Sequence, residues 1–109
     1  MAGEAIFHIT TAEGWAEAAQ TGRVVPASLA SEGFVHCSTA SQLAGTLERH
    51  FADAGELVLL RLRRDVLDPD LRWEPSGHGG VYPHLYRPIA VAEVAEALPW
   101  HPGEDLPRR

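Results

Sequence analysis

The sequence predicts an α+β domain in which a bent, mostly antiparallel sheet carries two main helices. Short β-prone runs and turn residues occupy much of the chain, and strands and helices do not alternate regularly as in a parallel α/β fold. Only two segments carry helix signals strong enough to count as main helices. Since 109 residues have room for one core, we expect a single domain over residues 1–109.

The first main helix follows a short strand at residues 5–9. Thr10 and Glu13 form a capping-box pattern, which predicts a helix over about residues 11–20. A short extended piece is expected after it, at residues 24–26.

The second main helix follows a second short strand. Residues 28–33 are expected to form a loop or a single turn, and residues 34–37 the strand. Ser and Thr then provide N-cap chemistry for a helix over about residues 39–53, which Gly55 ends. Three apolar residues, spaced four apart, would face the core from this helix: Leu43, Leu47 and Phe51.

The second half of the chain reads mainly as strands. Residues 57–62 form the strongest strand signal, apolar enough for the centre of a sheet. At the end of this half, residues 90–98 favour a closing strand, with a helix as the alternative. A loose tail is expected from about Pro99. The segments between them are a turn at 65–70, a strand at 71–74, a glycine-rich loop at 75–80 and an extended stretch at 82–88.

The acidic balance of the chain limits its partners. Nine Lys and Arg residues stand against fifteen Asp and Glu residues, for a formal charge of −6 at pH 7 with His neutral. Such a surface repels phosphate backbones and anionic membranes, so neither nucleic acid nor membrane is an expected partner. A local basic spot at Arg61, Arg63 and Arg64 still leaves room for a small phosphorylated ligand.

The single cysteine and the N-terminus indicate the expected location. Cys37 alone provides neither a disulfide scaffold nor a thiolate zinc cluster. The N-terminus lacks the basic segment and apolar run of a signal peptide, and the apolar run at residues 57–60 is far shorter than the ~20 residues of a membrane helix. We therefore expect a cytoplasmic protein, either a monomer or a weak homodimer.

Three of the six histidines share a local pattern. Each lies in a β-prone stretch with a hydroxyl-bearing residue two positions away, and residues two apart in a strand share a face. The three resulting polar patches are His8 with Thr10, His36 with Ser38, and His84 with Tyr82 and Tyr86.

Several alternatives compete with a functional role for these histidines. Each of them can be a structural residue bonded to the backbone. His50, His78 and His101 are expected on a helix flank, in a loop and in the tail, and no role is expected for them. A metal site built from His8, His36 and His84 lacks supporting His-x-His or His-x-x-x-His spacing, so no metal is expected. Because His36 and Cys37 are neighbours in a strand, they point to opposite faces, which disfavours a Cys-His nucleophile pair.

A carboxylate and a glycine-rich loop lie next to each other in the second half. Glu74 is either a catalytic acid or an exposed strand end. Residues 77–80 match neither the dinucleotide nor the Walker pattern of glycines, so we expect a mobile flap over a site instead of a phosphate cradle.

Four motifs together resemble the DUF952 family of small bacterial proteins over nearly the whole chain. The family's biochemistry is unassigned, as its label for a domain of unknown function states. The Tyr-Arg-Pro at residues 86–88 departs from the family's Tyr-Gly-Pro and puts Arg87 at a turn. The four motifs are Ile6-Phe7-His8-Ile9-Thr10, Glu32-Gly33-Phe34-Val35-His36-Cys37-Ser38 with Gln42, Trp73-Glu74, and Tyr82-Pro83-His84-Leu85-Tyr86.

This resemblance implies a fold similar to that of the ADP-ribosyltransferases, whose split, bent sheet holds NAD in a cleft. By this likeness His8 would contact a ribose, and His36 would stand where a tyrosine stacks on nicotinamide. The third catalytic position would fall to Glu74 or to the group around His84. The implied catalytic residues are His36, His84 and Glu74, and the implied cofactor-binding residues are His8, Thr10, Ser38, Gln42, Tyr82 and Tyr86.

Three classes of function remain open from the sequence. The first is a transferase using NAD or another nucleotide, for ADP-ribosyl or phosphoryl transfer, and the second is a nucleotide- or small-molecule-binding module without catalysis. The third is a protein that acts through protein contacts. The first predicts that His8, His36 and His84 converge on one cleft. An acid in that cleft would distinguish the first class from the second.

Overall fold

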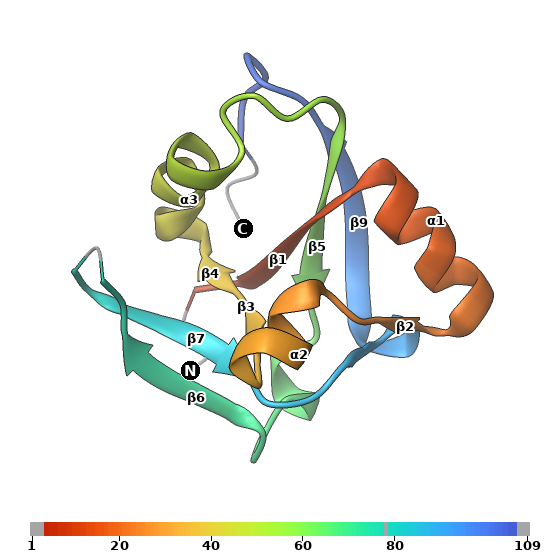
Figure 1. Cartoon of the computed structure of the whole chain (residues 1–109), viewed down its shortest axis with the longest axis vertical. Coiled ribbons are helices and arrows are strands. Elements are labelled where there is room, and N and C mark those ends of the chain that lie inside the picture. Colours follow the sequence, from red (N-terminus) through yellow and green to blue (C-terminus); the bar gives the residue numbers. More distant parts are fainter. Residues whose placement is uncertain (1–3, 78, 107–109) are drawn as a thin grey trace.

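The computed structural model describes residues 4–77 and 79–106, which fold around a four-stranded antiparallel sheet (Figure 1). Its strand order is β4-β1-β5-β9, so β5 lies between two neighbours, as its apolar sequence predicts. The predicted α+β class, with antiparallel sheets and two main helices, is confirmed. The bounds of the four strands are Ser38–Thr39 (β4), Ile6–Thr11 (β1), Leu57–Leu62 (β5) and Val94–Trp100 (β9).

A second, three-stranded sheet lies beside the first, and a short strand pair completes the fold. The sheet has the order β3-β7-β6, and β2 pairs with β8. The chain passes from β3 to β4 through Cys37, whose backbone N–H donates to the carbonyl of Pro83 at 3.1 Å. The expected strand at residues 34–37 is limited to β3 at residues 35–36, and residues 38–39, where the sequence predicts the cap of a helix, pair with β1 in the first sheet as β4. The bounds are Val35–His36 (β3), Val81–Leu85 (β7), Leu71–Pro75 (β6), Arg23–Val24 (β2) and Ile89–Ala90 (β8).

The central sheet is covered on both faces, which makes β5 almost entirely buried. Helix α1 (Ala12–Thr21) contributes Ala18 to one core cluster, and α3 (Leu43–His50) contributes to the other (Figure 1). The alternation of β5 supplies both clusters, with Val58, Leu60 and Leu62 in the first and Leu57 and Leu59 in the second.

Both main helices form, with corrected ends. Helix α1 is capped by Thr11 rather than Thr10, because the Thr11 hydroxyl accepts from the Gly14 backbone N–H at 2.9 Å. A 3-10 turn at Ala40–Gln42 precedes α3, which ends at His50 and not near residue 53. Phe51 is the C-cap residue, with a non-helical φ of −131° and ψ of 16°, and its side chain packs against the second core cluster.

The segment expected as a loop before β3 contains a short helix, α2 (Ala27–Glu32). Pro26 precedes its first turn, and Gly33, with a left-handed φ of 92°, ends it. None of its residues is buried, so it lacks the apolar periodicity by which sequence analysis detects helices. Its place in the fold matters because its last residue is Glu32.

The remaining segments follow the predictions with small changes. The turn at 65–70 includes a 3-10 turn at Arg64–Val66, and the loop after residue 75 joins β6 to β7 as a hairpin, although His78 lies outside the described residues. The closing segment is a strand and not a helix: a 3-10 turn at Val91–Glu93 leads into β9. The expected loose tail is wrong at its beginning, since β9 continues through Pro99 and Trp100, and Leu106 packs on the second core cluster.

In the described part of the chain, no helix combines the length and the apolar character needed to cross a membrane.

Candidate functional site

The three patterned histidines line one cavity of about 630 Å³ where the two larger sheets meet. His8 comes from β1, His36 from β3 and His84 from β7, so the cavity joins three segments far apart in sequence. Their convergence agrees with the expectation of a shared cleft. A cavity of this size is typical of small-molecule and cofactor sites.

His8 connects the two sheets at the wall of the cavity. Its Nδ1 bonds the backbone carbonyl oxygen of His36 at 2.7 Å, and because a carbonyl only accepts, Nδ1 carries the hydrogen. Burial lowers the pKa of His8 more than this bond raises it, and the nearby His36 lowers it further. At neutral pH His8 is therefore a neutral imidazole, and its Nε2, which carries no hydrogen, can accept a hydrogen bond from a ligand.

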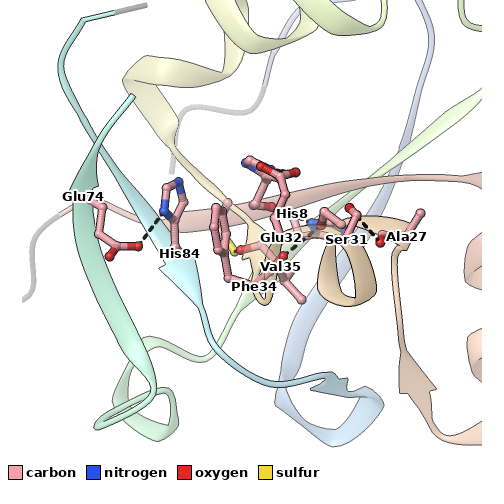
Figure 2. Close-up of polar contacts among 11 residues, drawn as sticks. His8, Ala27, Ser31, Glu32, Phe34, Val35, Glu74 and His84 are labelled. Atoms are coloured by element: carbon pink, nitrogen blue, oxygen red, sulfur yellow. Dashed lines mark hydrogen bonds and ion pairs between the residues drawn. The ribbon is translucent and has the colours of Figure 1, made fainter. Parts of the chain in front are cut away.

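An aromatic cluster places the other two imidazoles next to each other. His36 and His84 are partners across the β3–β7 ladder, and their ring centroids are 5.4 Å apart. Phe34 stacks on His84 with centroids 4.0 Å apart (Figure 2). The rings of Phe34 and His36 meet in a T-shaped contact with centroids 4.8 Å apart. This ring contact restricts the orientation of both imidazoles.

Each of these imidazoles has its own carboxylate. Glu32, at the end of α2, bonds Nε2 of His36 at 2.9 Å, and both side chains are about half exposed. Glu74, on β6, bonds Nδ1 of His84 at 2.8 Å, where the His84 side chain is only 9% exposed. Glu32 lines the cavity, whereas Glu74 lies behind His84 and is not among the lining residues. The acid that enters the cavity is thus Glu32.

Glu74 is held by two donors. The Tyr86 hydroxyl donates to Glu74 Oε1 at 2.5 Å, and the same oxygen bonds His84. The bond from Tyr86, and after it the bond from His84, hold the pKa of Glu74 below its ordinary value. The same bond to Glu74 raises the pKa of Tyr86. An ionised Glu74 only accepts, so His84 carries its hydrogen on Nδ1 and turns its Nε2 away from Glu74 (Figure 2).

Removing Glu74 is expected to change the tautomer of His84. The native protein should hold nearly all of its neutral His84 in the Nδ1–H form, because Glu74 accepts the hydrogen bond from Nδ1. Glu74→Ala should convert it to a mixture with the Nε2–H form, as measured by long-range ¹H–¹⁵N NMR of the imidazole. Tyr86→Phe keeps the Glu74–His84 bond and should leave the tautomer unchanged. An identical tautomer in Glu74→Ala would show that Glu74 does not orient His84.

The other residues expected in the site divide into two groups. Ser38 and Tyr82 line the cavity with the histidines. Gln42 is engaged in structure: its Oε1 accepts from the Thr39 backbone N–H, and its Nε2 donates to the Val81 carbonyl. Neither Gln42, Thr10 nor Tyr86 is among the residues that line the cavity.

Sequence reasoning assigned no role to four residues that line the cavity. Glu32 belongs to one of the DUF952 motifs and stands four positions before His36, but the sequence predicts a loop or a single turn there. Phe34 belongs to the same motif and is predicted as a strand residue, His50 is assigned to a helix flank, and Arg49 lies within the helix predicted over about residues 39–53.

Cys37 behaves as a buried structural thiol. It is 4% exposed, belongs to the first core cluster and has its pKa raised by burial to about 12. At neutral pH it is protonated, and a protonated thiol is a poor nucleophile. The sequence places His36 and Cys37 on opposite faces of a strand without deciding which of them enters the core. In the structure Cys37 is buried and the His36 side chain is about half exposed, and both residues line the cavity. Nor do any three His, Cys, Asp or Glu side chains within residues 4–77 and 79–106 form a group that would hold a metal ion.

Comparison with known proteins identifies the family of the chain. The model of a family described as "Protein of unknown function (DUF952)" matches residues 9–97. The chain belongs to the DUF952 family. The description of the family assigns no activity, so the chemistry of the site has to be derived from the residues themselves.

This DUF952 chain is similar to solved structures of the protein CC0527 from Caulobacter crescentus. Its crystal structure has a TM-score of 0.81 at 35% identity and covers 87% of this chain and 84% of that one. Its solution NMR structure has a TM-score of 0.75 at 36% identity, covering 85% and 81%. Among curated proteins, none matches this chain.

Proposed function

We propose that the cavity binds a nucleotide, with NAD as the first candidate, and that the protein is a transferase with an ADP-ribosyltransferase-like fold. The observation that carries this proposal is the convergence of His8, His36 and His84, from three strands, on one cavity of about 630 Å³. Few polar groups placed among aromatic walls are typical of cofactor sites.

The roles of the three histidines follow from their partners. Nε2 of His8 accepts a hydrogen bond from a ribose hydroxyl, since His8 is held neutral with its hydrogen on Nδ1. His36 and the Phe34–His84 stack form the wall against which a flat ring such as nicotinamide packs. Ser38 and Tyr82 add hydroxyl groups to the same cavity.

The proposed reaction transfers ADP-ribose from NAD to a nucleophilic acceptor. The glycosidic bond breaks and nicotinamide leaves with the bonding electron pair, so positive charge develops on the ribose. The carboxylate of Glu32, which lines the cavity, stabilises that charge. The acceptor loses its proton to His84 Nε2, and Glu74 acts only through His84 as a positioning residue.

The alternative is a nucleotide-binding module of the same fold without catalysis. It is favoured by the position of Glu74, the acid expected from the sequence, which does not line the cavity. The two functions differ in one result, because only the transferase releases nicotinamide from NAD.

Binding is tested first, by thermal unfolding with NAD, ADP-ribose or nicotinamide. A ligand at one hundred times its Kd stabilises the native state by about 2.7 kcal/mol, several degrees in a domain of this size. We expect this shift in the native protein and in His101→Ala, whose imidazole lies outside the cavity, and its loss in His36→Ala. No shift with any of the three ligands would contradict the nucleotide proposal.

Turnover then decides between the two functions. Nicotinamide release, followed by chromatography, should occur in the native protein and fall by two orders of magnitude or more in Glu32→Gln, which keeps the size of the side chain. Binding of NAD without any release would favour the non-catalytic module.

A further inference from the structure

Arg49 gives one end of the cavity a chemistry that the histidines do not supply. It stands in the last turn of α3 and lines the cavity. Its Nη2 donates to the Tyr82 hydroxyl at 2.8 Å, and its Cζ lies over the Tyr82 ring, 5.9 Å from the centroid. Strand β7 thus holds a guanidinium from α3 at the cavity wall.

The charge of Arg49 is not matched by a carboxylate. Within residues 4–77 and 79–106 it forms no ion pair, whereas Arg61 pairs with Glu96 and Arg87 with both Asp70 and Glu93. The carboxylate among the described lining residues, Glu32, bonds His36 instead. A guanidinium has five N–H donors, and the bond to Tyr82 uses one of them.

A glycine makes room for this guanidinium on the helix. A Cβ at Gly45 would lie 2.9 Å from Nη1 of Arg49, and its next nearest atoms are Cζ and Nη2 of the same residue. Glycine inside a helix costs about 0.5–1 kcal/mol relative to alanine. The absence of a side chain at position 45 therefore leaves room for the Arg49 guanidinium, which lies back along α3.

We propose that Arg49 forms a phosphate-binding subsite at this end of the cavity, which receives the phosphate or pyrophosphate group of the ligand. This inference rests on the proposed function, since it names the anionic part of the proposed nucleotide. The planar guanidinium matches phosphate oxygens with two parallel N–H donors, and the Tyr82 contact holds it in place. A local cation also explains how a chain of net charge −6 binds an anion.

The test compares ligands with and without phosphate by calorimetric titration: adenosine, ADP, NAD and inorganic pyrophosphate. Arg49→Met should raise the Kd for ADP and pyrophosphate about tenfold or more, because charge-assisted bonds are lost, and leave the Kd for adenosine unchanged. Arg23→Met removes an exposed arginine outside the cavity and should change none of these values. The Kd for pyrophosphate should also rise with salt in the native protein but much less in Arg49→Met.

A second variant tests the position of the guanidinium while keeping its charge. Gly45→Ala should favour the helix yet displace Arg49, so it should weaken pyrophosphate binding by a few-fold without lowering the unfolding temperature. This result separates loss of the subsite from loss of the fold.

The outcomes separate this inference from the proposed function. If ADP and NAD bind equally well to Arg49→Met and to the native protein, the subsite is wrong while nucleotide binding stands. If pyrophosphate binds through Arg49 but NAD and ADP bind no more tightly than pyrophosphate, the subsite stands and the nucleotide function is wrong. Binding of adenosine alone, or of none of these ligands, would overturn the inference.

Discussion

Replacing Arg87 by methionine is expected to lower the free energy of unfolding by about 2–3 kcal/mol. Arg87 pairs with Asp70 at 2.8 Å and, through two nitrogens, with Glu93 at 2.7 and 2.8 Å. The same guanidinium donates to the carbonyl groups of Val66 and Pro88. Its removal takes the guanidinium donors from all of these groups, including the 16% exposed side chain of Glu93, which then keeps the bond from the Ala90 backbone N–H.

The Arg87 network joins the turn before β6, the segment after β7 and the 3-10 turn before β9. It holds the pKa of Glu93 below its ordinary value, chiefly through the bonds from Arg87. A carboxyl whose pKa is lower in the folded state stabilises the protein above its unfolded pKa of about 4.5, and this contribution is lost as pH falls through the folded pKa.

Urea unfolding at pH 7 measures the loss of free energy of unfolding. In thermal unfolding, a loss of 2–3 kcal/mol should lower Tm by about 10 °C or more. Arg61→Met is the matched control, because the Arg61–Glu96 pair is about one-third exposed on both sides and such pairs contribute at most about 1 kcal/mol. Equal losses in the two variants would show that the Arg87 network contributes no more than a surface ion pair.

Lowering the pH from 7.5 to 5 is expected to destabilise the protein through His8. Because burial lowers the folded-state pKa of His8, the unfolded chain binds more protons than the native protein below about pH 6.5. The contribution of His8 is fully present above that pH and is lost as pH falls toward the folded pKa. The largest slope from one such group is about 1.4 kcal/mol per pH unit.

Urea unfolding at half-unit intervals between pH 7.5 and 5 would measure this slope. His8→Gln does not titrate and retains an N–H donor for the His36 carbonyl, so its stability should change less over the same interval. Glu74 and Glu93 do not interfere, since both have a lowered pKa and act below about pH 4.5. Equal slopes in the native protein and in His8→Gln would contradict the burial argument.

Local signals predicted many of the elements correctly. The apolar run at residues 57–62 predicted a central strand, and β5 lies between β1 and β9 with these bounds. The alternation of side chains along a strand also predicted that His36 and Cys37 differ in environment, and the structure shows that Cys37 is the buried one. Helix α2 escaped prediction because it buries none of its residues, so no periodic pattern marks it.

Arg87 illustrates a residue whose position was predicted but whose role was not. The sequence placed it at a turn, and it does follow β7. Its carboxylate partners, Asp70 and Glu93, lie 17 and 6 residues away in sequence, and no local sequence pattern predicts either bond.

The sequence by itself determined the class of fold, the central strand and the three patterned histidines, because periodicity and capping depend on residues a few positions apart. Only the tertiary structure decided which of these groups meet. Pairing of β3 with β7 brings His36 to His84, and α2 turns Glu32 into the cavity while Glu74 remains behind His84. These contacts depend on how segments distant in the chain pack together, and no local sequence pattern predicts the free energy of that packing.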